Sequence, residues 1–138
     1  MRSFFTIGFL DMFKLINFIF QDVNINPEVT FKLYLPFYRL CNLISKRKLI
    51  KYPLYILLLI YKIIGKFIGV DISYLCDIGD RLKIYHGFGL VVSGDATIGN
   101  DCVLRHGVTI GNVSKPLCDT LSPSIGDRVE FGTGAVVL

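Results

Sequence analysis

The sequence predicts a mainly β protein, with a parallel β-solenoid over residues 70–138 behind an α-helical segment over residues 1–69. Aliphatic side chains recur at every sixth position of the second half. A fixed short period of this kind is typical of solenoids in which each repeat supplies one short strand and one turn. The series comprises Ile72, Ile78, Ile84 and Leu90, then, after a slip of two residues, Val92, Ile98, Leu104 and Ile110, and after an insertion Ile125, Phe131 and Val137.

A second inward-facing position is expected four residues after most members of this series. It is occupied by Cys76, Leu82, Phe88, Ala96, Cys102, Val108, Val129 and Ala135. Three hexads would close one coil of about eighteen residues, with its strands stacked about 4.8 Å from those of the next coil. An ordinary small β domain with Ile-Gly turns is the alternative, but unrelated turns would not keep register over so many hexads.

The two halves of the chain differ in charge, although the whole carries only +4. Residues 1–70 contain ten Lys and Arg against three Asp and Glu, whereas residues 71–138 contain five against eight. A basic and apolar first half either faces an anionic membrane surface or is a solvated basic face on packed helices. Because the solenoid itself is acidic, no nucleic-acid partner is expected.

Two helices are expected before residue 46. Apolar residues between positions 5 and 19 fall near one face of a helix. The stretch Asn26-Pro27-Glu28 favours a second helix, with Asn26 as its cap and Pro27 at its first position. Pro36 is then expected to bend or end that helix.

A third, strongly apolar helix is expected over Leu54–Ile64, opened by Pro53. It is shorter than the roughly 20 residues that a bilayer span requires. Two interpretations stay open for residues 46–68. The segment either packs against protein or makes peripheral contact with a membrane interface.

The four cysteines show neither a Cys-x-x-Cys spacing nor a zinc pattern. Cys76 and Cys102 occupy inward positions of the repeat and are expected to act as small core side chains. This usage favours a reducing, cytoplasmic location.

Two histidines occupy corresponding positions of the repeat, since His86 follows Ile84 by two residues and His106 follows Leu104 by two. A neutral imidazole is a natural general base for a hydroxyl group, and a carboxylate can orient it. Asp71 precedes His86 by close to one coil, so the two side chains can meet near one edge. Structural roles for both are the alternative, and no metal site is expected because no third ligand stands at a suitable spacing.

Several motifs stand in order along residues 70–138. They are Val70-Asp71-Ile72, His86-Gly87-Phe88-Gly89-Leu90-Val91-Val92, Ile98-Gly99, Arg105-His106-Gly107-Val108-Thr109-Ile110-Gly111, Ile125-Gly126 and Phe131-Gly132-Thr133-Gly134-Ala135. In type and order they resemble the serine O-acetyltransferase family, one of the hexapeptide-repeat acyltransferases. Over the first 70 residues, only a helical segment ahead of the solenoid is shared.

This resemblance implies a left-handed parallel β-helix that forms trimers or dimers of trimers, with active sites between neighbouring solenoids. It implies acetyl-CoA as a co-substrate and no permanently bound cofactor. It gives His86 the role of catalytic base and Asp71 that of its partner carboxylate. Residues that match the donor groove, where the pantetheine arm of CoA packs, are Gly111, Gly132, Thr133 and Ala135.

Two departures from the family bear on the acceptor. Enzymes of the family that act on free serine carry an acidic residue directly before the catalytic histidine, where this chain has Tyr85. They also carry an Arg-His pair in an extruded loop, which matches residues 112–124 and holds Leu121-Ser122 here. A zwitterion needs paired charges in a buried site. The pattern is closer to the colanic-acid-type acetyltransferases, so a surface-polysaccharide sugar is favoured over serine as the acceptor.

The family continues with further coils and a C-terminal tail beyond the position of Val136-Val137-Leu138. We therefore expect the chain to be a fragment or a truncated gene product, with an incomplete donor site. Because a scaffold does not imply a function, a catalytically inactive solenoid that only assembles or binds a partner is the alternative.

Overall fold

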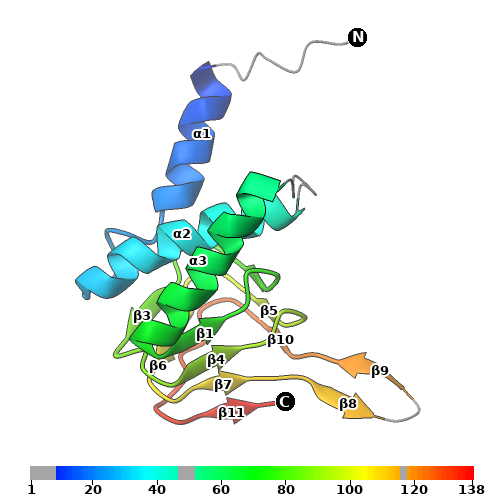
Figure 1. Ribbon diagram of the computed structural model, residues 1–138. Coiled ribbons are helices and arrows are strands. Elements are labelled where there is room, and N and C mark those ends of the chain that lie inside the picture. The colour runs from blue at the N-terminus through cyan, green and yellow to red at the C-terminus, as the bar shows by residue number, and fades with distance from the viewer. Residues whose placement is uncertain (1–8, 47–51, 116–117) are drawn as a thin grey trace.

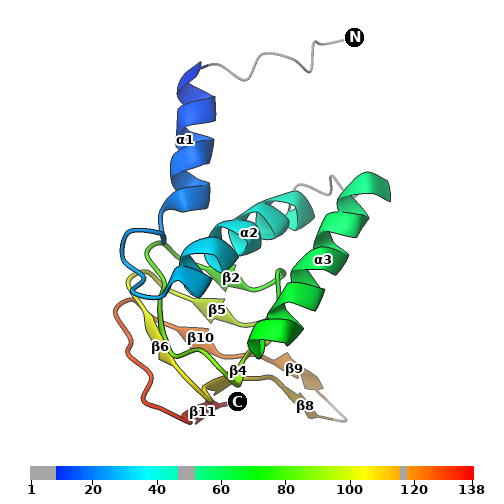
Figure 2. The same ribbon diagram turned by 60° about the vertical axis from the view of Figure 1, so that its left-hand side comes forward.

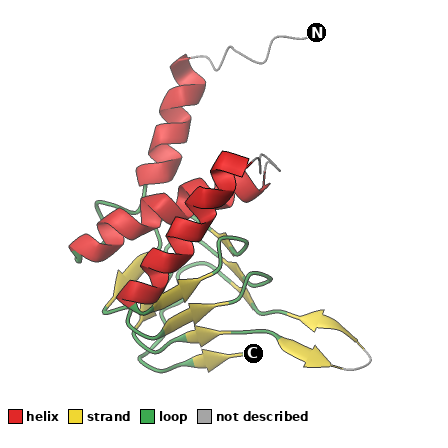
Figure 3. Ribbon diagram, in the orientation of Figure 1, coloured by secondary structure: helices red, strands yellow, loops and turns green. Residues whose placement is uncertain are grey.

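Three helices lie over one end of a stack of short strands in the computed structural model, which describes residues 9–46, 52–115 and 118–138 (Figures 1 and 3). The helices are α1 (Phe9–Phe20), α2 (Val29–Lys46) and α3 (Tyr52–Ile68). Their order along the chain, ahead of every strand, agrees with the predicted helical segment. The predicted boundary falls between Ile68, the last residue of α3, and Val70, the first residue of β1.

The strands form three parallel sheets that run along the stack and one hairpin that projects from it (Figure 2). The sheets have the orders β1-β4-β7-β11, β2-β5-β10 and β3-β6, and β8 pairs antiparallel with β9 in the hairpin. The strands are β1 (Val70–Ile72), β2 (Asp77–Ile78), β3 (Lys83–Tyr85), β4 (Leu90–Val92), β5 (Thr97–Ile98), β6 (Val103–Arg105), β7 (Thr109–Ile110), β8 (Val113–Lys115), β9 (Cys118–Leu121), β10 (Ser124–Ile125) and β11 (Val136–Val137).

The register confirms the predicted six-residue repeat. Val70 pairs with Leu90, Ile78 with Ile98 and Ile84 with Leu104, so equivalent residues of the first two coils stack directly on one another. The first eight members of the aliphatic series are all buried. Phe131 is buried as well, whereas Ile125 and Val137 are partly buried against the same core. Cys76 and Cys102 are fully buried, as predicted.

Phe88 is a wrong prediction, because its side chain is 76% exposed rather than inward. Residues 86–89 turn the corner between β3 and β4, and both His86 and Gly89 take positive φ there. The buried residue of this corner is Gly87, and a Cβ atom on it would stand 2.4 Å from Cζ of Phe31. The ring of Phe31, from α2, therefore fills the space that a solenoid side chain would otherwise occupy. The two extra residues of the slip place Phe88 outside, over Gly69.

The second helix begins later than predicted, at Val29. The carbonyl oxygen of Glu28 accepts the first helical hydrogen bonds, from the N–H groups of Phe31 and Lys32. Asn26 is therefore not the cap, because its buried side chain bonds to the solenoid instead. Pro36 lies inside α2, which continues to Lys46, so it does not end the helix.

The other two helices match the predicted regions. Residues 1–8 lie outside the described part, and α1 occupies the rest of its predicted stretch. Helix α3 contains all of Leu54–Ile64 and continues to Ile68. Gly65 allows its close approach to the solenoid, since a Cβ there would lie 2.6 Å from the carbonyl oxygen of Val70. Within the described residues, no helix combines the length and the apolar character needed to cross a bilayer.

Helices α2 and α3 cover the first coil and share one continuous hydrophobic core with it. The edge of a first coil leaves backbone groups without a strand partner, and buried groups of this kind require other partners. Polar side chains of the helical segment supply them. The hydroxyl of Tyr38 donates to the carbonyl oxygen of Cys76 at 2.7 Å, and the hydroxyl of Tyr61 donates to that of Ile72 at 2.6 Å.

A buried ion pair joins the helical segment to the same coil. Arg39 Nε lies 2.8 Å from Asp22 Oδ2, with both side chains at most 1% exposed. Two guanidinium nitrogens of Arg39 donate to the carbonyl oxygens of Ile78 and Gly79, and Asp22 accepts the N–H of Leu82. Every charged atom of the pair is thereby hydrogen-bonded, which is the condition for a stable buried ion pair.

Candidate active site

His86 stands at the corner after β3, where its side chain is 79% exposed. Its φ is 51°, a left-handed conformation that few residues other than glycine adopt. Its backbone N–H donates to Glu28 Oε1 at 2.7 Å, and its Nδ1 lies 3.1 Å from the same oxygen. The carboxylate that contacts this imidazole therefore comes from Glu28, the residue directly before α2.

His106 lies at the corresponding corner one coil later, but it is not the direct counterpart of His86. Tyr85 pairs with Arg105, and the first corner then has four residues (86–89) before Leu90 where the second has two (106–107) before Val108, so His106 stacks on Phe88. The predicted equivalence of the two histidines therefore holds only as far as the strands that precede them. His106 is exposed, its φ is not positive, and its imidazole has no hydrogen bond or ion pair to a described residue.

Asp71 lies in the middle of β1, opposite Val91, with its side chain exposed. Its carboxylate makes no hydrogen bond or ion pair with any residue that the structure describes, His86 included. Its negative charge acts on Tyr34: burial raises the pKa of the Tyr34 hydroxyl to about 12, and Asp71 contributes to that rise. The structure therefore does not join the two residues proposed as a pair.

The four residues assigned to the donor groove lie at two ends of the last described coil. Gly111 follows β7 and donates its N–H to the carbonyl oxygen of Val137 at 2.9 Å. Gly132 and Thr133 are exposed in the turn before β11, and Ala135 is half-buried there. The turn is composed of small residues, Gly132-Thr133-Gly134-Ala135.

Cationic side chains surround Tyr85, the residue before His86. Lys83 Nζ lies 4.9 Å from the centre of its ring, and Arg105 Cζ lies 5.4 Å from it. Arg105 is in turn paired with Glu130, its Nε at 3.2 Å from Oε1. The predicted extruded segment contains the β8–β9 hairpin, and the side chain of Leu121 lies outside the described part.

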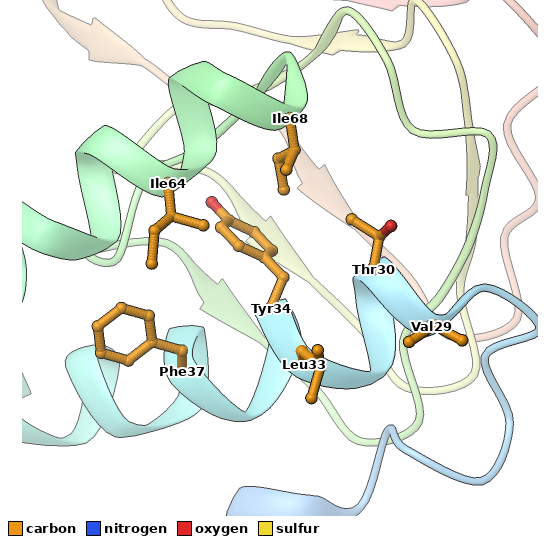
Figure 4. A pocket seen from close by; sticks show the side chains of 7 residues that line it. All are labelled: Val29, Thr30, Leu33, Tyr34, Phe37, Ile64 and Ile68. Carbon is orange, nitrogen blue, oxygen red and sulfur yellow. The ribbon is translucent and has the colours of Figure 1, made fainter.

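An apolar cavity of about 410 Å³ lies between α2 and α3 (Figure 4). Its walls carry no charged side chain. They comprise Val29, Thr30, Leu33, Tyr34, Phe37, Ile64 and Ile68. The cavity contains none of the residues predicted to act in catalysis.

Glu28 is the site residue that sequence reasoning missed. The pattern Asn26-Pro27-Glu28 was interpreted only as a helix start, and Glu28 is 58 positions from His86. No local pattern relates two residues so far apart. The signal lies in packing, because Phe31 sits against Gly87 one turn of helix away.

Comparison with known proteins places the chain near one group of acyltransferases, although no family model matches it. It is 39% identical over 83 residues to WcaB of Escherichia coli K12, whose name assigns it provisionally as a colanic acid biosynthesis acetyltransferase. That alignment covers 59% of this chain and 50% of WcaB. It is 35% identical over 102 residues to the serine acetyltransferase of Helicobacter pylori 26695, covering 73% of this chain and 56% of the relative.

Solved structures give the same result. Serine acetyltransferase isoform 3 of Entamoeba histolytica, in complex with cysteine, has a TM-score of 0.73 at 25% identity, over 93% of this chain and 49% of that one. Soybean serine acetyltransferase, complexed with serine, has a TM-score of 0.65 at 29% identity, over 79% and 43%. A serine acetyltransferase in complex with CoA, at 20% identity, shares the fold with a TM-score of 0.72. The chain spans about half the length of the curated relatives it matches.

Proposed function

We propose that this chain, which resembles the serine acetyltransferases and WcaB in sequence and the serine acetyltransferases in fold, is an acetyl-CoA-dependent O-acetyltransferase or the larger part of its catalytic unit. The observation that carries the proposal is the state of His86. Its imidazole is exposed at a corner of the solenoid, and Oε1 of Glu28 lies 3.1 Å from Nδ1. This contact leaves Nε2 free to accept a proton.

In the proposed reaction, Nε2 of His86 removes the proton of the acceptor hydroxyl as its oxygen attacks the thioester carbonyl carbon. The new carbon–oxygen bond forms a tetrahedral intermediate, whose negative oxygen is stabilised by backbone N–H groups near the site. The intermediate collapses with cleavage of the carbon–sulfur bond, and the imidazolium returns its proton to the sulfur of CoA. The products are the acetyl ester and free CoA thiol.

The donor is proposed to lie along Gly111, Gly132, Thr133 and Ala135. The small residues of the turn before β11 support this assignment, because the thin pantetheine arm needs a surface without projecting side chains. One structural neighbour is described in complex with CoA. The resemblance gives Asp71 the role of carboxylate partner of His86, and places each active site between neighbouring, left-handed solenoids of a trimer or a dimer of trimers.

A sugar hydroxyl on a surface-polysaccharide precursor is the favoured acceptor, with serine, and hence cysteine biosynthesis, as the other candidate. The surroundings of Tyr85 support the sugar, because Lys83 and Arg105 both approach its ring. The ammonium group of serine would meet Lys83 and the Arg105–Glu130 pair beside Tyr85, instead of the acidic residue that serine-specific enzymes carry directly before the histidine. An inactive solenoid is not favoured, because the relatives are named as acetyltransferases.

We further propose a cytoplasmic protein with peripheral membrane contact through residues 46–68. The support is a row of exposed apolar side chains on α3, flanked by exposed Lys62 and Lys66. This row comprises Tyr55, Ile56, Leu59, Ile60, Ile63, Ile64 and Phe67. Sedimentation with anionic and with neutral vesicles tests the contact. Binding to neither kind would refute it.

Thiol release from acetyl-CoA, with serine and with a panel of sugar acceptors, tests the proposed reaction. The His86→Ala variant should lower turnover by about 100-fold or more, since a positioned general base contributes roughly 10²–10⁴-fold. His106→Ala is the matched control, because it removes the same side chain from the corresponding corner, and it should retain most of the activity. Equal turnover in His86→Ala and the unaltered chain would refute the assignment of the base.

A further inference from the structure

We propose that Glu28, from the helical segment, is the positioning residue that holds the imidazole of His86. This inference rests on the proposed function, in which His86 is the base. One carboxylate oxygen, Oε1, accepts the backbone N–H of His86 at 2.7 Å and lies 3.1 Å from its Nδ1. The same atom therefore constrains both the backbone and the ring of a single residue.

The negative charge of Glu28 beside Nδ1 favours one protonation form of the ring. A carboxylate only accepts hydrogen bonds, so Glu28 favours the neutral form with the proton on Nδ1. Nε2 then has a free lone pair and points away from the carboxylate. This is the form in which a histidine removes a proton from a hydroxyl group.

The contact with the backbone replaces a bond that other corners of the solenoid make between coils. His86 has a φ of 51°, and three other corner residues, Arg81, Asp101 and Arg128, have φ between 57° and 59°. A left-handed conformation is unfavourable for a residue with a Cβ and persists where the surroundings hold it. The N–H groups of Asp101 and Arg128 donate to carbonyl oxygens of the preceding coil, whereas the N–H of His86, in the first coil, donates to Glu28.

The position of Glu28 is itself determined by packing. Its carbonyl oxygen accepts the first hydrogen bonds of α2, and Phe31, three residues later, is 3% exposed against Gly87. The side chain of Glu28 is only 32% exposed. The first turn of α2 is thus fitted onto the corner that carries His86, and the carboxylate follows from that fit.

Asp71 and Glu28 make a direct contrast. Both are carboxylates of the first 71 residues, but only Glu28 contacts His86, whereas Asp71 projects from β1 without a described partner. We therefore assign the orientation of the ring to Glu28. Asp71 remains available for a different role, such as contact with a neighbouring chain or with a substrate.

Four variants of the full chain separate these roles: Glu28→Ala, Glu28→Gln, Asp71→Asn and His86→Ala. Glu28→Ala should lower kcat by about 10- to 100-fold, a part of the contribution of the general base, and change KM for acetyl-CoA less than about twofold. Glu28→Gln should recover much of this loss, because its amide oxygen can accept the backbone N–H of His86 in the same way. Asp71→Asn should change the protonation form of the His86 ring less than Glu28→Ala does.

A second readout does not depend on activity. The chain has two histidines, so a His106→Asn background leaves one imidazole for nitrogen NMR. We expect the Nδ1-protonated form of His86 to predominate, and Glu28→Ala to shift the ring toward the Nε2-protonated form. Circular dichroism of each variant controls for folding.

The outcomes distinguish the two proposals. If His86→Ala abolishes turnover while Glu28→Ala changes neither turnover nor the ring form, the role of Glu28 is refuted and the proposed function stands. If His86→Ala retains full activity, the proposed function fails, and the ring spectra still decide whether Glu28 orients His86. A ring shift caused by Asp71→Asn instead would assign the orientation to Asp71.

Discussion

The first and second coils have the same repeat and different partners. Backbone groups of the second coil meet other coils: Cys102 accepts from Lys83, and Ala96 accepts from Asp77. The corresponding groups on the outer side of the first coil meet side chains of the helical segment, such as Tyr38 and Arg39. The difference teaches that helices can cover the end of a solenoid when their polar side chains supply the hydrogen bonds that the backbone of a further coil would supply.

The buried ion pair is where this comparison predicts the largest effect. Arg39→Ala leaves the carboxylate of Asp22 buried without its cationic partner, with only the N–H of Leu82 to stabilise it, and removes the donors to Ile78 and Gly79. We expect a loss of about 3–5 kcal/mol in the free energy of unfolding, measured by urea denaturation. Arg81→Ala, which removes an exposed ion pair with Asp101 between the first two coils, is the control and should change stability little. Equal losses of stability in the two variants would contradict the proposal that Arg39 stabilises the covered end of the solenoid.

Two glycines at successive corners provide a sharper test of how α2 fits the first coil. Gly87→Ala would force Cβ to within 2.4 Å of Phe31, at a cost of about 1–3 kcal/mol for overpacking. Gly107→Ala, one coil later, meets no side chain so closely, but its φ of 69° costs about 1–2 kcal/mol.

A Phe31→Leu background distinguishes the two causes of destabilisation, which are overpacking at Gly87 and an unfavourable φ at Gly107. There, Gly87→Ala should cost less, by about 1 kcal/mol of coupling, whereas the cost of Gly107→Ala should not change. Thermal unfolding of the three single and two double variants gives the comparison. Additive effects at Gly87 would show that Phe31 does not determine the shape of this corner.

Tyr38→Phe should have a smaller effect, of about 1 kcal/mol on the free energy of unfolding. The hydroxyl bond to the carbonyl oxygen of Cys76 is lost, but Asn42 Nδ2 donates to the same oxygen at 2.9 Å. The oxygen therefore keeps one partner. Combining Tyr38→Phe with Asn42→Ala should cost more than the sum of the two single changes, and urea denaturation of the double variant checks this.

The smallest effect at neutral pH concerns the titration of buried groups in the core between the helical segment and the first coil. Burial raises the pKa of the Cys41 and Cys76 thiols from 9.0 to about 12, and that of the Tyr34 hydroxyl from 10.0 to about 12. The folded state holds these protons more tightly than the unfolded state, so the stabilisation is complete below pH 9 and is lost as the pH rises toward 12. Unfolding measured between pH 8 and 11 should show this decline, and Cys41→Ala should reduce its slope. A flat profile would contradict it.

The sequence predicted the parts of the molecule that depend on local repetition. A six-residue period places side chains inside without reference to the rest of the chain, and the burial of Ile72, Ile84 and Leu104 follows from it. Phe88 was wrong because the slip at the corner breaks that period. Asn26 was wrong as a cap because its side chain bonds with Leu82 and Ile84, more than 50 positions away. The role of Glu28 could not be predicted for the same reason, because its contact with His86 depends on how α2 packs on the solenoid and not on any motif.

The residues of the helical segment lie far along the sequence from their hydrogen-bond partners in the first coil, and this has a consequence for synthesis. Arg39 leaves the ribosome about 40 residues before Ile78 and Gly79, and Asp22 leaves it 60 residues before Leu82. During that interval, the solenoid does not yet cover the Asp22–Arg39 pair and the apolar faces of the helices. Exposed apolar surfaces of this kind bind chaperones or aggregate. Translation speed through residues 40–85 therefore sets how long the chain is exposed to misfolding, and synonymous changes there should alter its yield without altering its sequence.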